Sequence, residues 1–282
     1  MQYTHHISYA PPTGELCAML EKYGVKYDKR ERFVVFDVLE KAPYYEALRS
    51  ELETVTDTKC IGDLISALYS EKERLAAPWL QISSSYAPIE PTQENQIAQA
   101  GSANRKCAYT TSSGKTIYRH YLDKVPYIIE KGAAWRKNRV FCTSIVSGYR
   151  DLFCNDDARE KMESAGLRGA AYCTVYRKTG EPFPDIWRLV LKPQPDFIVP
   201  ICGIQVNRCE VCGCNLYEAV EEKWSYHIDT HVIDSKLDFI QSPPVIGYRE
   251  YTSVQLISQR AYRFLKENKM NRALTFLPLQ CI

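Results

Sequence analysis

The sequence predicts an α+β protein with mixed or antiparallel sheets and short flanking helices. Short segments rich in Val, Ile, Phe and Tyr alternate with helical segments, and strand-like segments dominate the second half. A chain of 282 residues with 45% hydrophobic residues can bury one large core or two smaller ones. We therefore expect a folded protein that needs no disulfide bonds.

The first elements follow from residue type and spacing. Residues 31–41, ERFVVFDVLEK, are rich in Val and Phe and predict a buried strand. Pro43 is favourable in a first helical turn, and Leu48 and Leu52 recur at helical spacing after it. A helix is expected there.

A capping box marks the next helix. The hydroxyl of Ser70 lies three residues before Glu73, the arrangement in which each residue satisfies a backbone donor of the other. The helix must end by Pro78, and a short strand is expected over 79–82.

The composition then divides the chain into three parts. Residues 1–83 form a predicted N-terminal α+β region. About twenty polar, Pro- and Ser-containing residues, 84–104, predict a linker or mobile loop. Residues 105–282 form a predicted C-terminal α+β domain that carries a cysteine knuckle at 209–214.

The C-terminal part begins with strand patterns. Residues 105–111 and 115–123 flank Gly114 and predict a hairpin, and 139–145 predicts another strand. Residues 155–166 predict a compact helix, because Asn155 can cap its start and a glycine follows its end. Two further strands, AAYCTVY and DIWRLVLK, are expected to form the next hairpin.

Part of this pattern recurs at the C-terminus. Residues 157–176 and 260–279 each read as a helix, a turn and a strand, so both would pack in the same way on a sheet. We interpret this as an internal duplication of a helix–turn–strand unit. The apolar positions match as follows: Ala158 with Ala261, Met162 with Leu265, Leu167 with Met270, and Ala170 with Ala273.

Charge and hydropathy limit the partners. The 36 basic and 34 acidic residues give a net charge of +2, so the whole surface has no general attraction for phosphate backbones, and nucleic acid is not expected as a partner. The N-terminus lacks a basic start followed by an apolar run, and no stretch of about 18 apolar residues occurs. We expect a soluble cytoplasmic protein without membrane contact.

The chain has eleven cysteines, an odd number. With no secretory signal, this favours reduced thiols over disulfide bonds. Cys142 and Cys173 lie in apolar strand-like segments, where cysteine behaves as a small hydrophobic residue.

The segment RCEVCGCNLY contains a metal-binding pattern. Cys209 and Cys212 have the Cys-x2-Cys spacing of a zinc knuckle, and Gly213 relieves the backbone of the turn. His227 and His231 follow at a spacing that is also found in zinc sites. These residues are candidate zinc ligands.

The histidine segment, however, favours a strand. On a strand His227 and His231 lie about 13 Å apart, so at most one would bind the same metal. Cys107, Cys202 and Cys214 are then the available thiols, with at most four ligands in total. A zinc would be structural, because neither HExxH nor the zinc-deaminase pattern occurs. Alternatively, the turn binds no metal and its thiols are free.

No enzymatic activity is expected. G-x-S-x-G, the Walker loop and G-x-G-x-x-G are all absent. A cysteine and His120 remain as an alternative catalytic pair. The 20 tyrosines suggest either packing or a partner interface, and several lie in the middle of the chain. These are Tyr118, Tyr121, Tyr127, Tyr149, Tyr172 and Tyr176.

The order of these features, over roughly residues 65–282, resembles the double-CXXCG-motif bacterial proteins related to immunity proteins of polymorphic toxin systems. The resemblance lies in YSEKERLAAPWLQI, SIVSGYRDLFCNDDAREKMESAGLRGAAYCTVY, WRLVL, RCEVCG and LISQRAYRFLKENKMNRALTFLPL. It implies a non-enzymatic protein that binds and neutralises a cognate toxin. Such proteins carry a first Cys-x2-Cys before the strand KTIYRHYLD, where this chain has only Cys107. The alternatives are a zinc-stabilised nucleic-acid-binding module and a cysteine-dependent enzyme.

Overall fold

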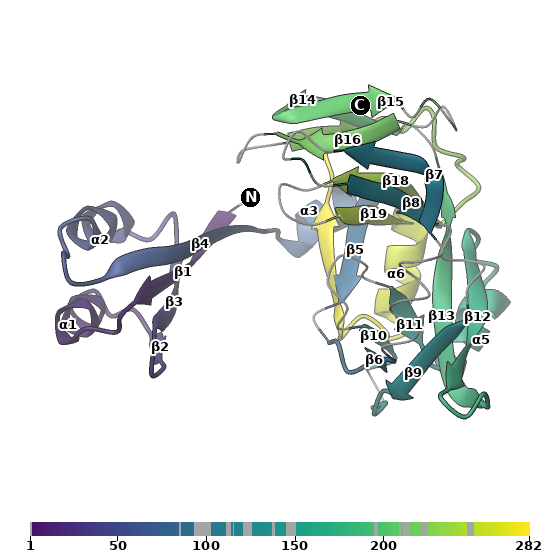
Figure 1. The fold of residues 1–282 in the computed structure, drawn as a ribbon, viewed down its shortest axis with the longest axis horizontal. Coiled ribbons are helices and arrows are strands. Elements are labelled where there is room, and N and C mark those ends of the chain that lie inside the picture. The colour runs from purple at the N-terminus through teal and green to yellow at the C-terminus, as the bar shows by residue number, and fades with distance from the viewer. Residues whose placement is uncertain are drawn as a thin grey trace. The chain divides into compact units, whose positions relative to one another are not determined.

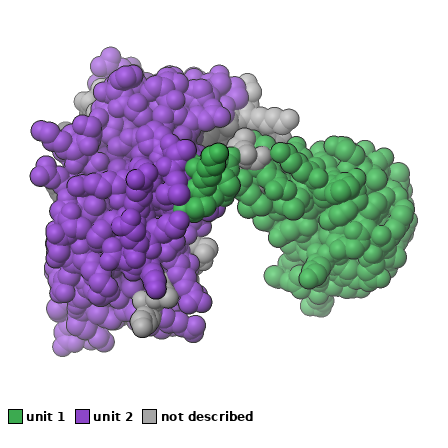
Figure 2. Space-filling view, turned by 180° about the vertical axis from the view of Figure 1, so that it is seen from behind, with its two compact units in different colours: residues 1–73 green, residues 74–282 purple. Residues whose placement is uncertain are grey.

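The chain is α+β, with antiparallel and mixed sheets and few helices, as predicted (Figure 1). This computed structural model describes residues 2–84, 86–92, 103–110, 114, 116–120, 126–136, 139–144, 151–194, 197–208, 210, 215–220, 225–246 and 251–282. Within them, the side chains of 63–67, 103–110, 116–120, 243–246 and 251–252 are not described. The chain divides into two compact units, Met1–Glu73 and Arg74–Ile282 (Figure 2).

The first unit is a four-stranded antiparallel sheet with two helices. Its elements are β1 (Gln2–Ala10), α1 (Gly14–Lys22), β2 (Tyr27–Lys29), β3 (Val34–Leu39), α2 (Tyr45–Leu52) and β4 (Lys59–Leu68). The strand order is β2-β3-β1-β4, and every neighbouring pair is antiparallel. This βαββαβ order is the ferredoxin-like arrangement. The predicted strand at 31–41 and the helix after Pro43 are confirmed as β3 and α2.

Alternation along β3 builds the core of the first unit. Val34, Phe36 and Val38 are buried, whereas Asp37 and Leu39 between and beyond them are exposed. The two helices cover the buried face with leucines at helical spacing. These are Leu16 and Leu20 of α1 and Leu48 and Leu52 of α2.

The predicted capping box is present at α3 (Glu71–Ala76). The backbone N–H of Glu73 donates to Ser70 Oγ at 3.2 Å, and that of Ser70 donates to Glu73 Oε2 at 2.7 Å. The helix ends before Pro78, as expected. The division between the two units falls within this helix.

The second unit is built mainly from strands. The first group is β5 (Trp79–Ser84), β6 (Glu90–Pro91), β7 (Ala103–Thr110), β8 (Thr116–His120), β9 (Tyr127–Lys131), β10 (Phe141–Thr143), β11 (Leu152–Cys154), α5 (Asp156–Ser164), β12 (Ala170–Arg177) and β13 (Pro182–Pro193). The second group is β14 (Ile198–Cys202), β15 (Ile204–Arg208), β16 (Asn215–Ala219), β17 (Ser225–Ile228), β18 (Phe239–Ile246), β19 (Tyr251–Ser258), α6 (Gln259–Glu267) and β20 (Leu274–Pro278).

One mixed sheet dominates this unit. Its strand order is β20-β5-β19-β18-β13-β12-β9-β6, with β10–β11 attached to β13 and β15–β16 attached to β18. Two small sheets, β14–β17 and β7–β8, complete it. The predicted hairpins β7–β8, with Gly114 between its strands, and β12–β13 are confirmed.

The observed division of the chain differs from the predicted one. β5 pairs with both β19 and β20, so residues 79–83 belong to the sheet of the second unit and not to an N-terminal region ending at 83. In the predicted linker 84–104, β6 pairs with β9 and Ile89 is fully buried. Sheet pairing with distant strands, which local composition does not reveal, accounts for both differences. Residues 85 and 93–102 lie outside the described residues.

Two parts of the sheet share one topology. α5 connects β11 to β12, and both strands lie antiparallel on either side of β13. α6 likewise connects β19 to β20, and both lie antiparallel on either side of β5. Each helix begins with a side-chain cap. The N–H of Ala158 donates to Asn155 Oδ1, and the N–H of Ala261 donates to Ser258 Oγ. Both helices pack on the same core.

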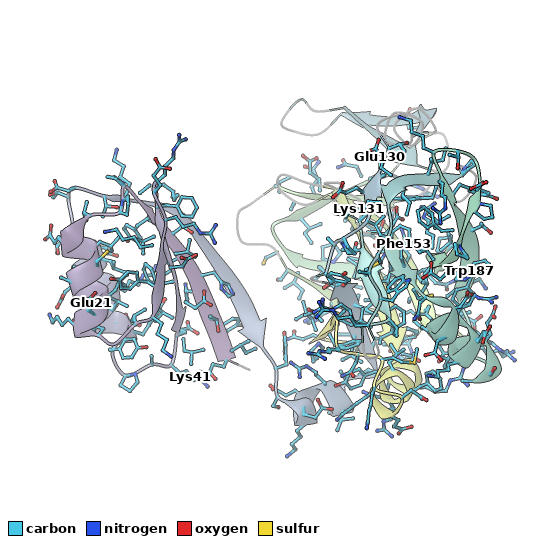
Figure 3. The ribbon with its side chains drawn as sticks, turned by 90° about the horizontal axis from the view of Figure 1, so that it is seen from below. Glu21, Lys41, Glu130, Lys131, Phe153 and Trp187 are labelled. Atoms are coloured by element: carbon cyan, nitrogen blue, oxygen red, sulfur yellow. The ribbon has the colours of Figure 1, made fainter. Side chains whose placement is uncertain are left out.

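A second core lies on the other face of β13. Phe153, Tyr127 and Ile186 are almost fully buried there, and Phe153 lies within the unit (Figure 3). Arg188 is buried among them with Asp151 as its ion-pair partner. No helix in the described ranges is both long and apolar enough to cross a membrane.

Candidate functional site

The cysteine knuckle connects two paired strands. Arg208 at the end of β15 lies opposite Asn215 at the start of β16. Cys209, Cys212 and Cys214 lie in the connection between them and are outside the described residues. Because opposite residues in an antiparallel pair have their Cα atoms about 5 Å apart, the two ends of this connection are close together.

Cys202 lies at the other end of this hairpin. It precedes Gly203 and Ile204, and Ile204 pairs with Ala219 at the base of the hairpin. The base and the connection lie at opposite ends of β15, so Ile204 and Arg208 are about 13 Å apart. Cys202 Sγ is 3.1 Å from Ser225 Oγ. The strand geometry therefore separates Cys202 from the knuckle.

The two histidines also lie away from the connection. β17 begins at Ser225, opposite Cys202, and contains His227, whose Nε2 is 2.6 Å from Gln280 Oε1. The strand ends at Ile228, shorter than the extended segment that was expected, so His231 lies in the exposed turn beyond it. Among the described residues, no group of three or more His, Cys, Asp or Glu side chains could hold a metal ion.

Cys107 lies on β7, which pairs with β8 in a separate two-stranded sheet. The pairing is interrupted between Asn104 and Ala108, so Cys107 falls in an irregular part of the strand. Its side chain is not among those described. Of the seven candidate ligands, Cys202 thus lies at the base of the hairpin, His227 lies on β17 opposite Val199, and His231 lies in the turn beyond the far end of β17, whereas the three knuckle cysteines belong to the connection.

The buried thiols are unsuited to nucleophilic catalysis at neutral pH. Burial raises the pKa of the Cys142 thiol. Burial, and in addition the nearby Cys142, raise the pKa of the Cys154 thiol well above its usual value. Burial also raises the pKa of Cys281. Since the thiolate is the nucleophile, these three residues are packing elements. The side chain of His120 is not described.

Of the tyrosines in the middle of the chain, two pack in the cores, one is partly buried, and three have side chains that are not described. Tyr127 is buried in the second core, and Tyr172 packs against the main core, where burial raises its pKa. Tyr176 is partly buried. The side chains of Tyr118, Tyr121 and Tyr149 lie outside the described set. Tyr127 and Tyr172 therefore serve the cores and do not form an exposed interface.

Five exposed aliphatic side chains lie on β14 and β15, directly after β16, in the turn after β17, and at the C-terminus. We call these five residues, each between 38% and 53% exposed, the C-terminal apolar surface. In the described part of residues 74–282, they are five of the six large apolar residues with such exposure, the sixth being Leu75. The five are Ile201, Val206, Val220, Val232 and Ile282.

Backbone pairing brings these residues to one region. The N–H of Val220 donates to the carbonyl of Gly203, beside Ile201. At the other end of β17, the N–H of Thr230 donates to the carbonyl of Ile282, two residues before Val232. The two groups thus lie at the ends of one four-residue strand. The sequence did not reveal this surface, because the five residues are separated in the sequence and only the pairing of the strands relates them.

Comparison with known proteins finds no family model that matches this chain and no curated protein with significant similarity to it.

Proposed function

We propose that this protein is a non-enzymatic immunity protein that binds and neutralises a cognate bacterial toxin in the cytoplasm. The C-terminal apolar surface is the observation that supports this proposal best. Aliphatic side chains gathered on one exposed region are typical of protein–protein contacts, whereas single exposed ones are common on any surface. The resemblance to double-CXXCG-motif proteins suggests the kind of partner.

A structural zinc fits the hairpin next to this surface. The proposed ligands are Cys209 and Cys212, because they have the Cys-x2-Cys spacing of a zinc knuckle and the residues on either side of their segment, Arg208 and Asn215, are paired. Cys107 and Cys214 are the remaining thiols of the proposed set. Cys202 is left out because it lies at the base of the hairpin, and the two histidines are left out because β17 leads away from that base. Purified protein should contain about one zinc per chain, and Cys209→Ser with Cys212→Ser should lower this to near zero.

We also propose that the second unit arose by internal duplication. The support is the shared strand–helix–strand topology around β13 and β5 and the equivalent helix caps. The central strand follows the helix in one copy and precedes it in the other, so the second copy would be circularly permuted.

The decisive experiment combines capture with protection. The tagged protein should retain one stoichiometric polypeptide from its host, and that polypeptide should arrest growth when it is expressed alone. Coexpression of this protein should restore growth. A captured protein with no effect on growth, or no protection, would contradict the immunity function.

Variants then test the binding surface. Ile201→Arg combined with Val232→Arg should abolish both capture and protection, because cations would replace buried contact area. Leu75→Arg is the matched control, since Leu75 is 36% exposed in the same unit but lies away from β14–β17. Equal loss in the control would show that the effect is not specific to the surface.

A zinc-stabilised nucleic-acid-binding module is the second candidate. The charge distribution favours it, because residues 74–282 carry 27 basic and 21 acidic residues while residues 1–73 carry 9 and 13. It requires nucleic acid in the captured material and binding that weakens steeply with salt. Salt-independent binding, or none, would remove it.

A further inference from the structure

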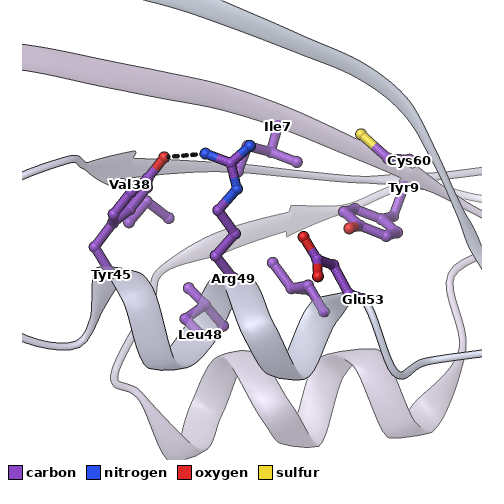
Figure 4. A pocket seen from close by; sticks show the side chains of 9 residues that line it. Ile7, Tyr9, Val38, Tyr45, Leu48, Arg49, Glu53 and Cys60 are labelled. Carbon is purple, nitrogen blue, oxygen red and sulfur yellow. Dashed lines mark hydrogen bonds between the residues drawn. The ribbon is translucent and has the colours of Figure 1, made fainter.

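The first unit contains a pocket of about 220 Å³ between α2 and its sheet (Figure 4). Its floor is apolar and nearly inaccessible to solvent. Ile7 of β1, Val38 of β3, and Leu48 and Leu52 of α2 form it, each 9% exposed or less. These side chains offer an apolar surface and no hydrogen-bonding groups, which favours an apolar group of a ligand in the pocket.

Charged and polar groups form the rim. Arg49 and Glu53 lie one turn apart on α2. Tyr9 and Cys60 face them from the paired strands β1 and β4. The Glu53 carboxylate makes no hydrogen bond or ion pair within the part of the chain that is described.

Buried groups hold the arginine at this rim. Arg49 Nη1 donates to Tyr45 Oη at 3.0 Å (Figure 4). Tyr45 Oη in turn lies 2.9 Å from Nε2 of His5, which is only 4% exposed. The Tyr45 hydroxyl, which accepts from Arg49, thus connects the guanidinium to the buried His5 ring. The guanidinium is thus positioned by a buried chain of hydrogen bonds, unlike a free surface arginine.

We propose that this pocket binds a small zwitterion with an apolar side chain, of the class of free aliphatic or aromatic amino acids. The carboxylate would accept hydrogen bonds from Arg49, the ammonium would pair with Glu53, and the side chain would contact the leucine floor. The volume of about 220 Å³ lies below the usual range for drug-sized ligands, so a small metabolite fits. This proposal is independent of the toxin-binding function.

Calorimetric titration of the full-length protein with chosen ligands tests the two charges separately. L-leucine and L-phenylalanine are the probes. Three incomplete analogues of L-leucine serve for comparison: 4-methylpentanoate lacks the ammonium, 3-methylbutylamine lacks the carboxylate, and glycine lacks the apolar side chain. Each incomplete analogue should bind at least about tenfold more weakly than L-leucine, because each loses one charge-assisted contact or the apolar one. No binding of either amino acid at about 10 mM, or equal binding of the analogues, would overturn the proposal.

Variants test the same contacts from the protein side. Arg49→Gln and Glu53→Gln should each weaken L-leucine binding by about tenfold or more. Glu46→Gln, on the exposed side of the same helix, is the control and should bind within about twofold of the unmodified protein. All three positions are exposed, so the fold should be retained.

Cys60 offers a readout that does not depend on heat signals. Its thiol is exposed at the pocket, so iodoacetamide should modify it, and bound L-leucine should slow that modification. Cys202, exposed in the other unit, is the internal control. Equal protection of both thiols, or of neither, would count against the site.

Discussion

At the scale of single residues, Gly169 has the strictest backbone requirement. Its φ is 96°, in the region that favours glycine, and an added Cβ would lie 2.1 Å from the carbonyl oxygen of Phe239. Phe239 cannot move away easily, because its own N–H donates to the carbonyl of Arg168. The turn between α5 and β12 therefore approaches β18 only with glycine at this position.

Gly169→Ala should destabilise the second unit by at least about 2 kcal/mol, since backbone strain and a clash with main-chain atoms add together. Urea unfolding measures this. Gly180→Ala is the control, because Gly180 has a φ of 86° but no atom lies within 4 Å of its added Cβ. It should cost about 1 kcal/mol, from strain alone. Equal losses for both variants would mean that the close approach to Phe239 is absent.

The stability of the second core depends on a buried ion pair. Arg188 Nη2 lies 2.9 Å from Asp151 Oδ1, and the Arg188 guanidinium lies 5.1 Å from the centre of the Tyr127 ring. Asp151 Oδ2 accepts no hydrogen bond from any described residue. The Asp151 carboxylate thus depends on Arg188 for compensation of its charge.

Arg188→Met should cost about 3–5 kcal/mol, because it leaves the Asp151 carboxylate buried without a counter-charge. Arg188→Met combined with Asp151→Leu should cost less than Arg188→Met alone. A double-mutant cycle in urea unfolding measures the coupling. Additive losses would show that the two charges are solvated independently.

At the scale of elements, Asp238 joins the α5–β12 turn to the start of α6. Its carboxylate accepts hydrogen bonds from the N–H of Arg168, from Ser258 Oγ and from the Arg260 guanidinium. Burial alone would raise its pKa, but these donors, with Arg260 contributing most, hold the pKa of Asp238 below its usual value. The turn after α5 and the start of α6 are thereby connected through one carboxylate.

A depressed pKa in the folded state makes this stabilisation dependent on pH. It is fully present above the pKa of an unfolded aspartate, about 3.9, and is lost as pH falls through the lower folded value. Asp238→Asn should therefore reduce the unfolding free energy at pH 7 by about 1–3 kcal/mol. The difference from the unmodified protein should shrink below about pH 4.

Asp185→Asn is the control for this comparison, because Asp185 is exposed and its side chain has no described partner. It should leave the unfolding free energy unchanged across the same pH range. If the cost of Asp238→Asn stayed constant from pH 7 to about pH 3, the carboxylate charge would not be the stabilising feature.

The elements also show how far the sequence could predict the structure. Strand β3, helix α2, the capping box before α3 and the capped helix α5 rest on residues close in sequence, so local patterns were sufficient. The place of β5 between β19 and β20 depends on pairing with residues almost 200 positions away, which has no local pattern. For the site, His227 fitted the ligand spacing and Cys202 was an available thiol, but the structure places Cys202 at the base of the β15–β16 hairpin and His227 on β17, away from the connection that carries the knuckle.

At the scale of the whole molecule, the first unit is formed by one continuous part of the chain with its own core. All elements of residues 1–73 are contiguous, and their core of twelve buried residues is made within the unit. Domains of this size can fold alone when such a core is present. The first unit therefore has what an independent fold requires.

A fragment of residues 1–73 should unfold cooperatively, with a free energy of about 4–10 kcal/mol for its length. Circular dichroism during thermal or urea unfolding tests this expectation. A gradual loss of signal with no transition would show that the unit depends on the rest of the chain. Leu48→Ala should lower the stability of the fragment by about 2–5 kcal/mol, because Leu48 is buried in its core.

The position of β5 has a consequence for protein synthesis. β5 is the first strand of the second unit, yet one of its neighbours, β20, is the last named strand of the chain. On the ribosome, the first unit can fold as soon as it emerges, whereas β5 must wait until residues 274–278 have been made. A message cut short before that point would yield a folded first unit attached to a second unit with an unpaired strand edge.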